Sequence, residues 1–144
     1  MSTNKIIGHS KIVMIDEIIN ESKEFSLRER SSIRTIGILK LIDLDNNLAL
    51  LEYKQTYLYC TIDQFISHLP SKINKYYQII GELEKPNLKQ QKEIEKRENQ
   101  GNKINKDWIL NSRVHRLIDG IDIDLYKESL IVRRKFENQH GSFN

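Results

Sequence analysis

The sequence has one cysteine, two prolines and no long hydrophobic run. One cysteine cannot form an internal disulfide framework or a multi-cysteine zinc site. No apolar run approaches the roughly 20 residues that cross a bilayer, and no basic start leads into a signal-type core. Cys60 lies between Leu58 and Ile62 at strand spacing, which favours a small buried filler over a nucleophile. We therefore expect a soluble intracellular protein without membrane contact.

Catalytic motifs are also missing. The sequence contains no glycine-rich phosphate loop, no HExxH and no GxSxG. The four histidines are scattered without the spacing of metal ligands. Turn and cap roles explain the acidic residues better than a catalytic carboxylate pair does. We predict that the chain is not an enzyme and holds no metal or cofactor.

What remains is the composition of one globular domain. The 144 residues are 38% hydrophobic and 30% charged, which is enough for one core and a well-solvated surface. The formal charge of +3 is only mildly basic. Such a balance permits contact with nucleic acid but does not demand it.

Five apolar runs of the β type punctuate the chain. The turn signal Asp45-Asn46-Asn47 separates the first two runs, and a short amphipathic segment, Gln64–Leu69, precedes the fourth. Strand, hairpin, strand, strand, short helix and strand is the order of a small Greek-key barrel of the oligonucleotide-binding (OB) type. The sequence therefore predicts an all-β fold with flanking helices, namely a five-stranded OB barrel with a C-terminal helix. The runs are Ile33–Leu44, Leu48–Tyr53, Tyr57–Ile62, Tyr76–Leu83 and Trp108–Ile118.

Within the barrel, strand alternation predicts which side chains face inward. On the third strand, Tyr57 and Tyr59 should face outward, side by side on the surface. On the fifth strand, Leu110 and Val114 should face inward, with Arg113 and His115 outward. Gly37 is well placed for the bend that the long first strand needs.

The segments around the barrel give the domain organisation. Residues 1–31 form a tail and a covering segment, in which Lys11–Asn20 fits either a helix or a strand. The barrel occupies residues 32–118 and includes a polar connection at 85–106, mobile or partly helical, between its last two strands. A helix follows at 119–138, and a tail at 139–144.

The C-terminal helix is the best-marked helix of the chain. Asp122 or Asp124 can cap its start, and basic residues near its end suit the helix dipole. Its apolar residues cover more than one stripe, which is wider than one contact with the barrel requires. We interpret this helix as a docking element for another chain. Those apolar residues are Leu125, Tyr126, Leu130, Ile131, Val132 and Phe136.

A second candidate site lies on the strands. Tyr57, Tyr59 and Tyr76, bordered by cations such as Arg113, would stack the bases of a single-stranded nucleic acid. The alternative is that these tyrosines are ordinary strand residues, half buried under the long connection.

Three short motifs, in this order along the chain, resemble a known family. They are Arg34-Thr35-Ile36-Gly37, Ile80-Gly81-Glu82-Leu83, and Gly120 leading into a helix with a late aromatic. The chain is similar to the Ten-one family, the small single-OB-fold subunit of the CST telomere complex. The Lys-, Asn- and Ile-rich composition fits an AT-biased genome and, with it, a ciliate telomerase-associated form. The small subunit of replication protein A has the same architecture and is the nearest relative with which the chain can be confused.

The resemblance implies a nuclear protein of telomeric chromosome ends that binds an Stn-type OB partner within a heterotrimer. Its contact with single-stranded telomeric DNA would be weak or indirect. It would support telomere capping and length regulation, help recruit polymerase α–primase for complementary-strand synthesis, and help limit telomerase. The telomerase holoenzyme and polymerase α–primase are the further partners that the resemblance implies. The alternative is an autonomous single-strand-binding module. The implied partner-binding residues are Arg34, Tyr126, Leu130, Arg133, Arg134 and Phe136.

Overall fold

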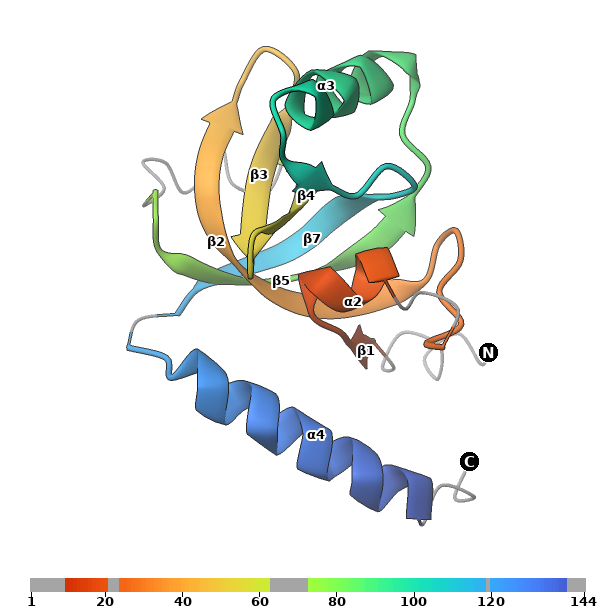
Figure 1. Ribbon diagram of the computed structural model, residues 1–144, viewed down its shortest axis with the longest axis vertical. Helices are drawn as coiled ribbons and strands as arrows, with labels where there is room; N and C mark the ends of the chain where they lie inside the picture. The colour runs from red at the N-terminus through yellow and green to blue at the C-terminus, as the bar shows by residue number, and fades with distance from the viewer. Residues whose placement is uncertain (1–9, 21–23, 63–72, 119, 140–144) are drawn as a thin grey trace.

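The computed structural model describes residues 10–20, 24–62, 73–118 and 120–139. A closed ring of five strands forms the centre, and three helices lie around it (Figure 1). The ring consists of β2 (Ser32–Asp43), β3 (Leu48–Tyr53), β4 (Thr56–Thr61), β5 (Tyr76–Glu84) and β7 (Ile109–Leu117). The OB barrel with a C-terminal helix is therefore confirmed.

The ring closes because β2 is shared by two neighbours. Its first half pairs with β5 and its second half with β3, and Ile38 takes part in both pairings. On the other side, β7 pairs antiparallel with β5 and parallel with β4. A closed ring leaves no unpaired edge in the barrel wall.

Local sequence explains the two short turns of the barrel. Asn47 has a φ of 56°, and Asp43 accepts a hydrogen bond from the Asn46 amide, so the expected turn between β2 and β3 is confirmed. The next turn is tighter and consists of Lys54 and Gln55, with φ values of 51° and 64°. Two consecutive residues with positive φ give the twist that a two-residue hairpin needs.

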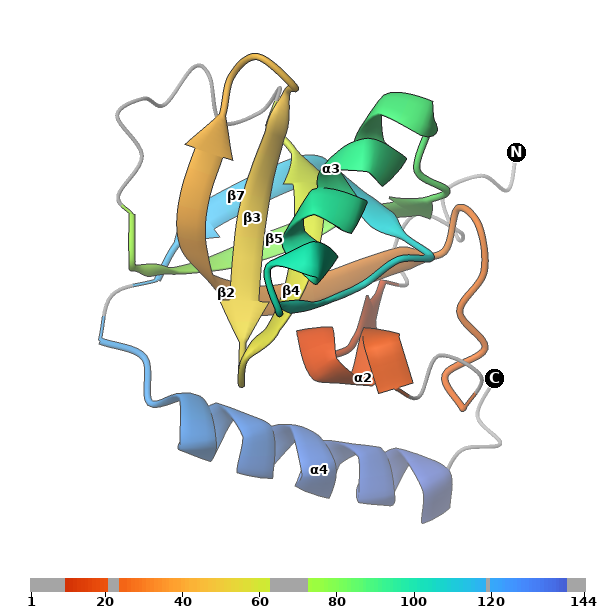
Figure 2. The ribbon, with the colours of Figure 1, turned by 45° about the horizontal axis from the view of Figure 1, so that its top comes forward.

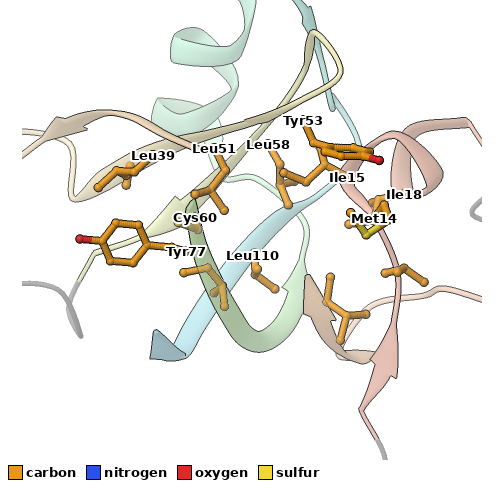
Figure 3. Close-up of a cluster of buried hydrophobic side chains, with 14 of the residues drawn as sticks. Met14, Ile15, Ile18, Leu39, Leu51, Tyr53, Leu58, Cys60, Tyr77 and Leu110 are labelled. Atoms are coloured by element: carbon orange, nitrogen blue, oxygen red, sulfur yellow. The ribbon is translucent and has the colours of Figure 1, made fainter. Parts of the chain in front are cut away.

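The N-terminal segment provides one cover of the barrel. It contains both elements that the sequence allowed, a short strand β1 (Lys11–Ile12) and a helix α2 (Ile15–Asn20). Val13, Met14 and Ile15 are fully buried and join the cluster inside the barrel (Figure 3). Burial of this much apolar surface ties the segment to the barrel.

Gly37 has a packing role at this cover. A Cβ on Gly37 would lie 2.7 Å from Cδ1 of Ile15 and 3.2 Å from Cβ of Leu51. The irregularity in the pairing of β2 with β3 falls at Lys40 and not at the glycine. The absent side chain of Gly37 therefore makes room for α2.

A second cover comes from the connection between β5 and β7. Residues Leu88–Asn99 form helix α3, and Lys103–Ile104 form strand β6, which pairs with the start of β4. A capping box starts α3, because Asn87 and Gln90 each accept a hydrogen bond from the other's backbone amide. Figure 2 shows α3 lying across the outside of β3 and β4.

Two expectations about side chains were wrong, one about direction and one about exposure. Val114 is 47% exposed, whereas we expected it inside the barrel. The cause is a one-residue shift in the pairing between β5 and β7 at Ile80/Gly81, opposite Arg113. Such a bulge reverses the inward and outward alternation for the rest of the strand. His115 accordingly contacts the ring of Tyr77 in place of facing outward. Arg113 does face outward, as expected.

The second error concerns Tyr59, which is only 2% exposed. It does point to the outside of the barrel, but α3 covers it there. Together with Ile94 of α3 it belongs to a second apolar cluster, completed by Leu48, Leu50, Ile104 and Ile109. The expected short helix at 64–69 lies outside the described residues.

Candidate functional site

Helix α4 (Ile123–Gln139) crosses below the barrel and carries two different faces (Figures 1 and 2). Asp122 is its cap, because its carboxylate accepts a hydrogen bond from the Leu125 amide at 3.1 Å. The inner face holds Leu130, which is 6% exposed and belongs to the core cluster. Ile123 and Tyr126 pack against the same cluster, so the helix is fixed to the barrel along several turns.

A buried carboxylate completes this attachment. Glu17 of α2 accepts hydrogen bonds from Arg134 at 2.7 and 2.9 Å and from Lys127 at 3.1 Å. Arg134 also donates to the backbone oxygen of Ile12 at 2.8 Å, and its guanidinium lies 4.7 Å from the centre of the Phe25 ring. One acid from the N-terminal cover thus binds two cations of α4.

The pKa of Glu17 shows that its hydrogen bonds favour the charged carboxylate. Burial alone would raise the pKa, since it disfavours the charged form. Hydrogen bonds from Arg134, the Met14 amide and Lys127 outweigh burial and lower the pKa to about 2. The carboxylate therefore stays charged at neutral pH, and both cations remain paired.

The outer face of α4 is apolar and open to solvent. Leu125, Val132 and Phe136 are 58%, 64% and 58% exposed, and their spacing of seven and four residues puts them on one stripe. Ile131 is 45% exposed as well, but it lies about 100° around the helix from Val132 and so outside this stripe. We call Leu125, Val132 and Phe136 the outer stripe of α4. Single exposed apolar residues are ordinary on a protein surface, but four along one helix mark a candidate interface.

Four of the six residues expected to bind a partner divide between the two faces of α4. Phe136 and Arg133 are exposed, and Arg133 pairs with Glu137 at 3.1 Å. Leu130 and Arg134 face inward and hold the helix to the barrel. Leu125, Ile131 and Val132 were absent from the expected set, although the excess width of the apolar pattern was their signal.

The other two expected residues lie between α4 and the barrel. Burial raises the pKa of the Tyr126 hydroxyl, and the charge of Arg34 lowers it, followed by those of Arg133 and Arg134. Arg34 on β2 is partly buried, and its Nε has no hydrogen-bond partner among the described residues. Arg34 therefore borders α4 from the barrel side.

The tyrosines expected to stack bases do not form one platform. Tyr59 lies beneath α3, where its hydroxyl accepts a hydrogen bond from Nε of Arg97 at 3.0 Å. Tyr57 and Tyr76 do share a row across the sheet, but Ile38 and Glu52 stand between them. A carboxylate in that row repels the phosphates that such a site must accept.

Arg113, the cation expected beside that platform, forms an ion pair away from the tyrosines. Arg113 pairs with Glu82 at 3.0 Å on the neighbouring strand. It lies at the bulge between β5 and β7, whereas Tyr57 lies on β4. The four expected nucleic-acid residues are therefore spread over three strands.

Neither a metal-holding cluster nor an exposed cysteine is found in the described part of the chain. No three acidic, cysteine or histidine side chains gather there in a way that would hold a metal ion. Cys60 is fully buried, and burial raises the pKa of its thiol to about 12, so it stays a protonated core residue. None of the described helices is long and apolar enough to cross a membrane.

Solved structures that share this fold include two from S. pombe. One is the S. pombe Stn1–Ten1 complex, with a TM-score of 0.61 and 14% identity over 88% of this chain and 93% of that one. The other is the telomere-capping protein Ten1 of S. pombe, with a TM-score of 0.60 and 14% identity over 88% and 99% of the two chains. At this identity the likeness shows the fold alone. No curated protein sequence matches the chain.

Sequence comparison identifies the family directly. The profile of a family described as a telomere-capping subunit of the CST complex matches residues 6–140, nearly the whole chain. This match confirms the resemblance carried by the three short motifs. The chain belongs to the Ten1 family, the non-enzymatic OB-fold subunits of the telomere-capping CST complex.

Proposed function

We propose that this protein is the small subunit of a CST complex and pairs with an Stn-type OB protein through the outer stripe of α4. The observation that carries the proposal is the stripe itself: Leu125, Val132 and Phe136 are 58–64% exposed. The solved S. pombe structure with the same fold is a complex of Stn1 with Ten1, which supports the choice of partner.

The attachment of the inner face makes the stripe suitable for binding. Leu130 and the pairing of Glu17 with Arg134 fix the helix before any partner arrives. A surface that is already ordered loses little conformational entropy on association, so more of the interface free energy appears as affinity. Lys135 and Glu137 are exposed on this helix and would supply a polar rim around an apolar centre.

Membership of the family supports the wider role. We propose that the pair joins a third subunit at telomeric chromosome ends in the nucleus. There it would support capping, length regulation and complementary-strand synthesis by polymerase α–primase, in association with the telomerase holoenzyme. The family is non-enzymatic, so these contributions would come from assembly. As long as α3 covers Tyr59, contact with telomeric single strands would be indirect.

Pairing can be tested by co-expression and by isothermal titration calorimetry with an Stn-type OB protein. Val132→Glu and Leu125→Glu put an unpaired charge into the proposed interface, and we expect each to weaken binding at least thirtyfold, or about 2 kcal/mol. Leu88→Glu is the matched control, since Leu88 is 76% exposed on α3 and lies away from α4.

The expected result is loss of pairing with the two α4 variants and unchanged pairing with Leu88→Glu. Circular dichroism and thermal unfolding should show the same folded state for all three, since each position is exposed. Wild-type affinity in both α4 variants would overturn the proposed surface. Failure of the wild-type chain to pair with any Stn-type protein would overturn the proposed partner.

A further inference from the structure

Helix α3 lies on the face that OB barrels use for oligonucleotides. In such barrels the second and third strands, together with the loops beside them, form the ligand surface. Here those strands are β3 and β4, and α3 belongs to one of the neighbouring loops. The chain therefore covers its own potential binding face with its own helix.

The cover rests on few contacts. Ile94 is the only described residue of α3 that is buried, at 3% exposed, and it packs with Leu48, Leu50 and Tyr59. The hydrogen bond from Arg97 to the Tyr59 hydroxyl adds a polar contact. Lys106 pairs with Glu98 at 3.1 Å, but both side chains are largely exposed, so this pair contributes little.

The helix has its own means of staying folded. The capping box at Asn87 and Gln90 closes its start, and at its end Asn102 donates to the Arg97 backbone oxygen. Gly101, with a φ of 89°, ends the helix in the left-handed conformation that glycine adopts without strain. These contacts lie within α3 and its own turns, so the ends of the helix are capped without help from the barrel.

The surface beneath α3 has the composition of a single-strand site. It contains Tyr59, the half-buried ring of Tyr57, and the apolar side chains of Leu48 and Leu50. Flat aromatic rings stack bases of any sequence. Lys54 and Lys103 line an open groove of about 560 Å³ beside Tyr57, where they would attract phosphates.

We propose that α3 is a displaceable, autoinhibitory cover of a single-strand-binding face on β3 and β4. With α3 in place, single-stranded nucleic acid finds this surface blocked. With α3 released, Tyr57 and Tyr59 become accessible together. Apparent affinity for single strands is then the intrinsic affinity reduced by the small fraction of molecules with α3 open.

The test breaks α3 without touching the face. Lys92→Pro puts a proline into the middle of α3 at an exposed position. The proline disrupts the helix, and every residue of β3 and β4 stays unchanged. Lys92→Ala is the matched control, because it loses the same positive charge and keeps the helix. Fluorescence anisotropy with a labelled G-rich 18-nucleotide DNA measures binding to the full-length chain.

We expect Lys92→Pro to bind this DNA at least tenfold more tightly than Lys92→Ala. Hydrogen exchange should show residues 88–99 unprotected in the proline variant alone. Adding Tyr59→Leu to Lys92→Pro should remove the gain, since the stacking ring is lost. Unprotected 88–99 with no gain in affinity would overturn the proposal, as would a gain that survives Tyr59→Leu.

Should Lys92→Pro fail to fold, Ile94→Ala provides the second variant, because it removes the one buried anchor and leaves the helix intact. Continued protection of 88–99 in a folded Lys92→Pro would show that α3 cannot leave the barrel, which also overturns the proposal. The inference deepens the proposed function but fails separately from it. Pairing with an Stn-type protein should be unchanged in every α3 variant, because α3 and α4 lie at opposite ends of the barrel (Figures 1 and 2).

Discussion

Helices α3 and α4 both cover the barrel, but their free faces differ. Each uses one principal buried anchor, Ile94 in α3 and Leu130 in α4. The solvent-facing side of α3 is mostly charged. The solvent-facing side of α4 carries the apolar outer stripe. Attachment to the barrel therefore does not identify a binding helix. The composition of its solvent-facing side does.

The strength of attachment differs as well. Two cations of α4 share the buried carboxylate of Glu17 on α2, whereas α3 adds one hydrogen bond from Arg97 to Tyr59. A binding helix benefits from firm attachment, because a partner then meets a fixed surface. A displaceable cover requires the opposite. The predictions that follow test this contrast, beginning with the largest effect.

Removal of Glu17 should have the largest effect on stability. Glu17→Ala leaves Arg134 and Lys127 partly buried without their acid, which we expect to cost about 4 kcal/mol of the free energy of unfolding. Urea unfolding followed by circular dichroism measures it. Glu137→Ala is the control, since its exposed pair with Arg133 should contribute less than about 1 kcal/mol. Equal effects of the two variants would mean that α4 is not held by Glu17.

Acid should weaken the attachment of α4 through the same carboxylate. The pKa of Glu17 is about 2 in the folded protein against an ordinary 4.5, so the folded state favours the charged form. Its contribution to stability is present above pH 4.5 and is lost as the pH falls toward 2, by about 3 kcal/mol in all. The wild-type chain should therefore lose more stability over this range than Glu17→Gln. Parallel pH profiles of the two would contradict this assignment.

Truncation of the α3 anchor should have a smaller and more local effect. Ile94→Ala removes three carbon atoms from the second cluster and should lower the free energy of opening α3 by about 2 kcal/mol. Hydrogen exchange of residues 88–99 measures it, with Leu88→Ala as the exposed control. Protection should fall in α3 and stay constant in α4. A uniform fall across the whole barrel would show that α3 is part of the global core.

The hydroxyl of Tyr59 should contribute least. Tyr59→Phe removes the acceptor of the Arg97 hydrogen bond and should destabilise the chain by about 1 kcal/mol. Tyr57→Phe, on the same strand, is the control and should change the free energy of unfolding by less than half as much. An unchanged stability in Tyr59→Phe would leave Ile94 as the sole contact of consequence.

Much of the fold followed from local sequence. The alternating runs gave β3 with its bounds, and the Asp-Asn-Asn signal gave the turn before it, because both depend on neighbours in the chain. Val114 was misplaced for a different reason. The bulge opposite Arg113 arises where β7 meets β5, and one extra residue there reverses which side chains face the core.

The candidate site was predictable in kind but not in every residue. The apolar width of the C-terminal helix indicated two faces, yet it did not say which residues take the inner one. That choice depends on Glu17, more than a hundred positions away, which draws Arg134 inward together with Leu130. Phe136, placed by its late position in the helix, is on the outer stripe.

The sequence by itself determined the class of barrel, the capped C-terminal helix and the family, because these depend on periodicity, caps and short motifs. Only the tertiary structure decided which surface is open. Tyr59 has the alternation of an exposed strand residue, and α3, some forty positions away, buries it. Exposure is a property of what packs on a residue, and in this chain the packing partners come from distant segments.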